Sequence, residues 1–150
     1  MQCLKYKSKS SFWKNLLISF SGQKNEHKKF LVCVLKDEVF AKALKNIYKD
    51  ERFKTLSVEL ISIKDETNIP HCQLLFLGKK TQDINKVLLS LKGQSVLTVS
   101  DNHMNIPKNV MIVMFVQNNK IKYIINNKLA QDSKVHISHL LLRSAQEVIK

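Results

Sequence analysis

Residues 30–48 read FLVCVLKDEVFAKALKNIY, an apolar run of strand length followed by an apolar pattern with helical spacing. The run 30–35 contains no alternating polar residue, which is typical of a strand buried on both faces of a parallel sheet. Asp37 stands where a helix N-cap is expected, because its carboxylate can accept a hydrogen bond from a first-turn N–H. The predicted buried stripe of the helix is Phe40, Ala43, Leu44, Ile47 and Tyr48. The segment therefore predicts a β–α unit.

Strands and helices continue to alternate after this unit. Further strands are predicted at residues 56–63, 73–77 and 95–99. A second helix is predicted where apolar residues recur at i, i+3, i+4 and i+7, namely Ile84, Val87, Leu88 and Leu91. Pro70 breaks the chain before the third strand, and Gly93 ends the second helix, since glycine readily takes the left-handed backbone conformation. Such alternation implies right-handed βαβ units and a parallel sheet.

The last part of the chain has a different pattern. Apolar runs at 111–116 and 120–125 are joined by Gln117-Asn118-Asn119, and asparagine tolerates the positive φ of a tight hairpin turn. Ser138 can cap a terminal helix whose apolar face would be Leu141, Leu142, Ala145, Val148 and Ile149. The predicted fold class is therefore α/β: a Rossmann-like three-layer sandwich with a mostly parallel sheet, a C-terminal antiparallel hairpin and a terminal helix.

The charge of the chain is concentrated at its start. Residues 1–29 hold seven lysines and the single acid Glu26, within a net charge of +13 for all 150 residues. This part also carries an apolar helical pattern, made of Phe12, Trp13, Leu16, Leu17 and Phe20. We therefore divide the chain into a basic N-terminal segment with an amphipathic helix, residues 1–29, and one α/β domain, residues 30–150.

Composition argues against nucleic acid and against an integral membrane segment. The basic residues are almost all lysine, whereas base reading favours the bidentate guanidinium group of arginine. No stretch approaches the roughly 20 apolar residues that a membrane-spanning helix needs. Lys14 and Asn15 interrupt the first apolar region, so no clear signal peptide is recognised, and a truncated start is one explanation.

Enzyme and cofactor motifs are not found. The turn Lys36-Asp37-Glu38 has no glycine to admit a pyrophosphate, and no P-loop occurs, so no cofactor is predicted. His136 and His139 have no carboxylate or thiol at ligand spacing, and we read them as polar residues at a helix terminus rather than metal ligands. The loop 100–103 holds serine, acid and histidine contiguously, a geometry that rarely forms a triad. We therefore predict a nonenzymatic protein.

Two further features bear on function. Cys3, Cys33 and Cys72 are too few for a disulfide scaffold, and we expect Cys33 and Cys72 to act as small buried hydrophobes. Ser100 and Asp101 follow a predicted parallel strand, where open α/β sheets place ligands, although a capping role is the alternative.

Five blocks of sequence resemble one known family. The run Val96-Leu-Thr-Val-Ser-Asp101 resembles the signature strand and loop of the YfiR family of bacterial signalling repressors. The other blocks that are similar to the family, in the same order, are residues 30–40, 70–77, 111–126 and 135–143.

The resemblance implies a periplasmic protein, often a homodimer, that binds the periplasmic sensing domain of a membrane diguanylate cyclase. It thereby represses the cyclase, lowers cyclic di-GMP and opposes biofilm formation. Cys72 matches the family's strand cysteine and is a candidate redox cysteine, with its partner left open. The candidate residues for binding a ligand or partner are Ser100, Asp101, Asn126, Ser138 and Arg143. The alternatives are a small-ligand sensor domain, with Arg143 available for an anion, and a degenerate remnant without a partner.

Overall fold

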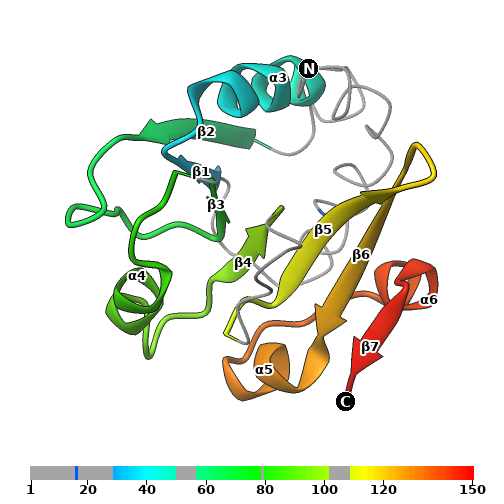
Figure 1. The fold of residues 1–150 in the computed structure, drawn as a ribbon. Helices are drawn as coiled ribbons and strands as arrows, with labels where there is room; N and C mark the ends of the chain where they lie inside the picture. Colours follow the sequence, from blue (N-terminus) through cyan, green and yellow to red (C-terminus); the bar gives the residue numbers. More distant parts are fainter. Residues whose placement is uncertain (1–15, 17–28, 50–56, 79, 102–108) are drawn as a thin grey trace.

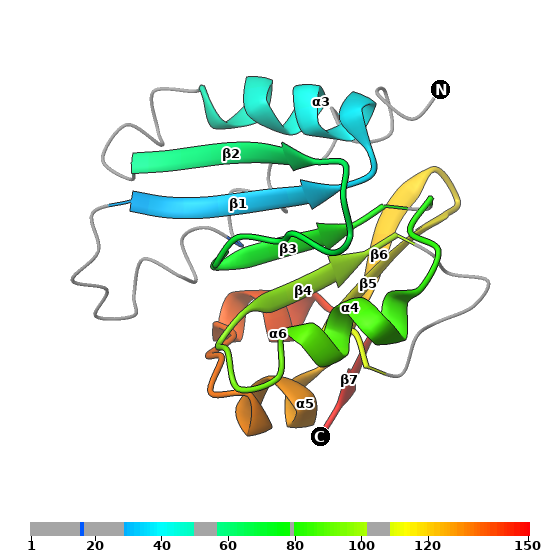
Figure 2. The same cartoon turned by 90° about the vertical axis from the view of Figure 1, so that its left-hand side faces the viewer.

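The computed structural model describes residues 16, 29–49, 57–78, 80–101 and 109–150. These residues form a seven-stranded sheet in the order β2-β1-β3-β4-β5-β6-β7 (Figures 1 and 2). The strands are β1 Lys29–Leu35, β2 Ser57–Ile63, β3 Leu74–Leu77, β4 Leu97–Ser100, β5 Ile112–Gln117, β6 Lys120–Asn126 and β7 Glu147–Ile149. The helices are α3 Glu38–Tyr48, α4 Ile84–Ser90, α5 Asn127–Asp132 and α6 His139–Ser144.

Strands β1 to β5 all run parallel, and β6 is antiparallel to β5. The mostly parallel α/β fold with a late hairpin is therefore confirmed. At the hairpin turn, Asn118 and Asn119 have φ values of 53° and 61°, as a two-residue turn of this type requires.

Side chains alternate along the strands and build two separate cores. Val32 and Val34 of β1 belong to the first core, to which α3, α5 and α6 contribute. Cys33 and Leu35 point to the second core, which α4 covers. In Figure 1, α3 and α6 accordingly lie on one side of the sheet and α4 on the other. The sheet is thus the middle layer of a three-layer sandwich.

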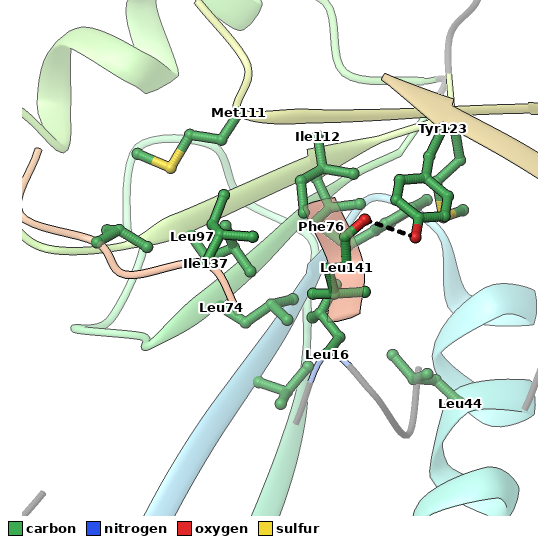
Figure 3. Close-up of a cluster of buried hydrophobic side chains, with 14 of the residues drawn as sticks. Leu16, Leu44, Leu74, Phe76, Leu97, Met111, Ile112, Tyr123, Ile137 and Leu141 are labelled. Carbon is green, nitrogen blue, oxygen red and sulfur yellow. Dashed lines mark hydrogen bonds between the residues drawn. The ribbon is translucent and has the colours of Figure 1, made fainter. Parts of the chain in front are cut away.

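The first core contains residues from both the beginning and the end of the described chain (Figure 3). Leu16 is helical and fully buried in it, and the rest of the predicted helix at 10–21 lies outside the described residues. The Tyr123 hydroxyl donates a hydrogen bond of 2.9 Å to the Leu141 carbonyl, which fixes α6 against β6. Phe40 of α3 stacks on Phe76 of β3 with ring centroids 4.0 Å apart.

Local signals in the sequence explain where the helices begin and end. The Asp37 carboxylate accepts a hydrogen bond of 3.0 Å from the Phe40 N–H, which confirms the predicted cap of α3. The Ser138 hydroxyl caps α6 by accepting from the Leu141 N–H. Gly93, with a φ of 88°, follows α4 as predicted.

The predicted long terminal helix is wrong. Helix α6 ends at Ser144, and β7 then pairs in parallel with β6. The backbone becomes extended at Ala145, and the Gln146 N–H donates to the Tyr123 carbonyl at 2.8 Å. Pairing with β6 satisfies backbone groups that a continued helix would have left on an open sheet edge. Helix α5 was not predicted, because six residues are too few for a periodic signal.

Cys33 and Cys72 form a disulfide, which corrects the expectation that they are separate small hydrophobes. Cys33 lies on β1 and Cys72 just before β3, and their Cα atoms are 6.1 Å apart. Strands β1 and β3 are neighbours, so two residues that are 39 apart in sequence meet in the second core. None of the helices in the described parts of the chain has the length and apolarity to cross a membrane.

Candidate functional site

The usual ligand crevice of an open α/β sheet is filled in this protein. Strands β2 and β3 lie on opposite sides of β1, so the connection changes direction between β1 and β3, where such folds bind ligands. Here the Gly78 N–H donates to the Leu35 carbonyl at 3.0 Å. A Cβ atom at residue 78 would come within 2.5 Å of that carbonyl oxygen. The backbone of Gly78 therefore occupies the crevice.

An ion pair closes the same end of the sheet further. Lys36, which has a φ of 54°, follows β1, and its Nζ lies 2.8 Å from Glu66 Oε1. That oxygen also accepts the Gln82 N–H at 3.0 Å, so three loops are joined. The hydrogen bonds from Lys36 and Gln82 lower the pKa of Glu66. An ionised, fully bonded carboxylate of this kind has a structural role and is a poor general acid.

Ser100 and Asp101 lie at the end of β4 and are almost completely buried, with 1% and 4% of their surface exposed. Leu77 of β3 pairs with Ser100, so Gly78 and Asp101 lie next to each other after their strands. The position agrees with the prediction, but both side chains are inside the protein.

Asn126 and Ser138 lie in another region and cap helices. The Asn126 N–H donates to the Met111 carbonyl at 2.7 Å, level with the beginning of β5, at the opposite end of the sheet from Asp101. Its side-chain oxygen accepts the Leu129 N–H at 3.0 Å and so begins α5. Ser138 begins α6 in the same way. The five candidate residues therefore do not form one site.

Arg143 is exposed and lines a cavity of about 520 Å³ between α5, α6 and β7. The lining residues are Asn127, Gln131, His139, Leu142, Arg143, Val148 and Lys150. The cationic side chains of Arg143 and Lys150, beside Leu142 and Val148, suit a small anion with an apolar part. The sequence did not indicate Val148 and Lys150, because they reach this cavity through the pairing of β7 with β6.

The described residues give no support for metal chemistry. Among the side chains described, no three from His, Cys, Asp and Glu come together as a metal ion would need. The candidate regions are therefore an exposed cationic cavity at α6 and a closed, buried end of the sheet at Asp101.

Comparison with known proteins identifies the family. A model of the YfiR/HmsC-like family matches residues 6–146. The chain belongs to the YfiR/HmsC-like family. The YfiR/HmsC-like family comprises periplasmic regulators that act on membrane signalling, and it is a regulatory rather than a catalytic family. No curated protein matches the chain.

Among solved structures, this YfiR/HmsC-like chain is similar to the ABC domain from Streptococcus pneumoniae, which was crystallised in complex with L-Trp. The TM-score is 0.54 and the sequence identity 12%, with 80% of this chain and 55% of that chain covered. The chain thus spans about half of that structure. At this identity the likeness concerns the α/β fold alone.

Proposed function

We propose that this YfiR/HmsC-like chain represses a membrane diguanylate cyclase by binding its periplasmic sensing domain. The match to the family over residues 6–146 carries the proposal. The filled crevice at Gly78 supports it, because a domain without an open pocket at that place acts more readily through its surface.

Repression of this kind is a shift in population. The cyclase has an active and an inactive state, and the repressor lowers cyclic di-GMP output because it binds the inactive state more tightly. Equal affinity for both states would leave the ratio of active to inactive cyclase unchanged, however tight the binding. The difference between the two affinities, rather than affinity itself, therefore sets the degree of repression.

Helix α6 is the proposed contact surface. Arg143 is the exposed member of the five candidate residues, and Leu140 on the same helix has 57% of its surface exposed. Arginine is enriched among the residues that supply most of the binding energy at protein interfaces, and an exposed leucine offers apolar surface to bury. Ser138 caps this helix, whereas Ser100, Asp101 and Asn126 lie elsewhere in the fold and are not part of the proposed surface.

The test is a titration of the purified chain with the periplasmic domain of a diguanylate cyclase from the same cell, repeated at rising salt. We expect saturable binding that survives physiological salt, since the net charge of +13 gives nonspecific attraction that salt screens. Leu140→Ser with Arg143→Ala should weaken it, whereas Lys42→Ala on the exposed face of α3 removes a charge and should not. Binding that disappears with salt, or equal effects of the two sets, would contradict the proposal.

A small-ligand sensor is the second candidate function. The cavity of about 520 Å³ beside Arg143 and Lys150 favours it. L-Trp, the ligand of the similar fold from Streptococcus pneumoniae, is a reasonable first probe. A ligand that binds only the folded state raises the melting temperature. We expect such a rise in the unmodified chain and its loss in Arg143→Ala, and a missing rise would count against this function for that probe.

Homodimer formation is a separate proposal that follows from the family resemblance. Light scattering over a range of protein concentrations measures the mass of the particle. A mass of twice the 17.4 kDa chain would support a dimer, and a constant monomer mass would contradict it.

A further inference from the structure

A second cavity, of about 800 Å³, lies between α4 and α5 at the amino ends of β4 and β5. Its volume falls in the range of small-molecule sites. It shares no lining residue with the cavity beside Arg143, so it is a separate feature of the molecule. Its walls are largely apolar and include Leu88, Leu91, Val96, Met111 and Leu129.

Leu89 extends this apolar wall into solvent. It lines the cavity, and 70% of its surface is exposed. An exposed leucine at the mouth of an apolar cavity can cover the body of an apolar ligand. The cavity is therefore suited to a molecule with an apolar body.

The buried polar groups of this wall are turned towards the protein. Thr98 lines the cavity and is 96% buried, and its hydroxyl oxygen accepts the Met111 N–H at 3.0 Å. Gln94 also lines the cavity, but its Oε1 is buried and has no surface that a bound molecule could reach. Polar recognition of a ligand therefore has to come from the rim.

The charge at the rim is positive. Lys92 stands on the α4 side and Lys134 on the α5 side, against the single carboxylate of Asp132. Lys134 has a φ of 61° because it ends α5: the Lys134 N–H donates to the Gln131 carbonyl at 3.0 Å, and the Val135 N–H donates to the Ala130 carbonyl at 2.8 Å. This helix ending places the backbone of Lys134 at the rim of the cavity.

We infer that the cavity between α4 and α5 binds a small carboxylic acid with an apolar tail. The tail would lie on the apolar wall and Leu89. The carboxylate would lie at the rim, near the ammonium groups of Lys92 and Lys134. This inference does not rest on binding to a cyclase.

The test is isothermal titration of the full chain with two compounds of equal chain length, decanoate and decanol, each below its solubility limit. We expect one saturable site, with decanoate bound about threefold to tenfold more tightly than decanol, because only decanoate carries a negative charge.

One variant separates binding from folding. Lys134→Gly removes the ammonium group and lets glycine take the left-handed conformation freely, so stability should not fall. Affinity for decanoate should nevertheless drop by about threefold to fivefold.

The matched control is Lys128→Ala, which removes the same charge from an exposed position on α5 that does not line the cavity. Its affinity should stay within about twofold of the unmodified chain. The inference is overturned if no compound gives saturable binding or if decanol binds as tightly as decanoate. Equal loss of affinity in Lys134→Gly and Lys128→Ala overturns it too, because the attraction is then a property of the net charge.

Discussion

Cys33 of β1 and Cys72 before β3 are joined by a disulfide that lies inside the second core. Disulfides of this kind persist in oxidising compartments, which agrees with the periplasmic location of the family. Both cysteines are buried, with 0% and 2% of their surface exposed. A reductant can therefore reach the disulfide only when the second core opens.

Loss of this disulfide should lower stability strongly. The bond spans 39 residues, and a closed loop of that length stabilises a protein by about 4 kcal/mol through the unfolded state. We expect Cys33→Ala with Cys72→Ala to unfold at a much lower urea concentration, and reductant to act on the unmodified chain in the same direction. Equal urea midpoints with and without reductant, measured after full equilibration, would show that the bond does not form in solution.

Gly78→Ala and Gly93→Ala should differ, although both replace a glycine near α4. At residue 78 the new Cβ meets the Leu35 carbonyl oxygen, whereas at residue 93 it meets nothing within 4 Å. We expect about 2 kcal/mol or more to be lost at residue 78 from the clash. At residue 93 we expect about 1 kcal/mol, from the positive φ alone. Urea unfolding measures both, and a smaller loss at residue 78 would show that the crevice is not closed by close backbone contact.

The ion pair of Lys36 with Glu66 should make stability depend on pH in the acid range. The pKa of Glu66 is lowered from 4.5 in the folded protein, so its contribution is present above that value and is lost as the pH falls through the lowered pKa. Glu66→Gln should cost up to about 1 kcal/mol at pH 7, because both side chains are only partly buried, with 26% and 18% of their surface exposed. The difference from the unmodified chain should shrink towards pH 3 in urea titrations. A difference that does not change with pH would contradict the ionic role.

Tyr123→Phe should test how α6 is held. The substitution keeps the ring in the first core and removes the hydrogen bond to the Leu141 carbonyl, so we expect a loss of about 1 kcal/mol. Burial raises the pKa of Tyr123, so the unmodified chain should keep this bond at pH 10, where an exposed tyrosine begins to ionise. Ultraviolet titration of the phenol measures the ionisation, and a normal transition at pH 10 for Tyr123 would contradict its burial.

Asn126 can be tested as a cap and as a binding residue separately. Its side-chain oxygen begins α5, so Asn126→Ala should cost about 1 kcal/mol, and Asn126→Ser should restore most of it because serine also caps helices. If the affinity for the cyclase domain falls in Asn126→Ala and recovers in Asn126→Ser, loss of the helix cap explains the whole effect. Weaker binding in both variants would give the amide a direct role in recognition.

The sequence predicted well the structural features that depend on residues close together in the chain. Asp37 as a cap, Gly93 as a helix end and the turn at Asn118 and Asn119 are local signals, and all are confirmed. The alternation of strands and helices was sufficient for the fold class. By contrast, α5 and β7 are too short to leave a periodic pattern, and β7 lies where a continued helix had been predicted.

The candidate site was harder to predict because it depends on the register between strands. Asp101 and Asn126 both follow strands, but β6 runs antiparallel to β5, which places them at opposite ends of the sheet. The pairing of Cys33 with Cys72 likewise follows from the adjacency of β1 and β3, which the sequence does not reveal. Arg143 could be singled out, but the cavity it lines also needs Val148 of β7 and Lys150, which follows β7.

The turn at Asn118 and Asn119 also bears on how the chain folds. It lets β5 and β6 pair across a two-residue connection, and such hairpins form within about 1–10 μs. Each parallel pair, in contrast, must first bring together segments far apart in the chain, and topologies rich in such contacts fold slowly. The hairpin of β5 and β6 can therefore form before β1 and β3 have paired. Refolding should accordingly show an early phase confined to the C-terminal strands, followed by slow completion of the parallel sheet.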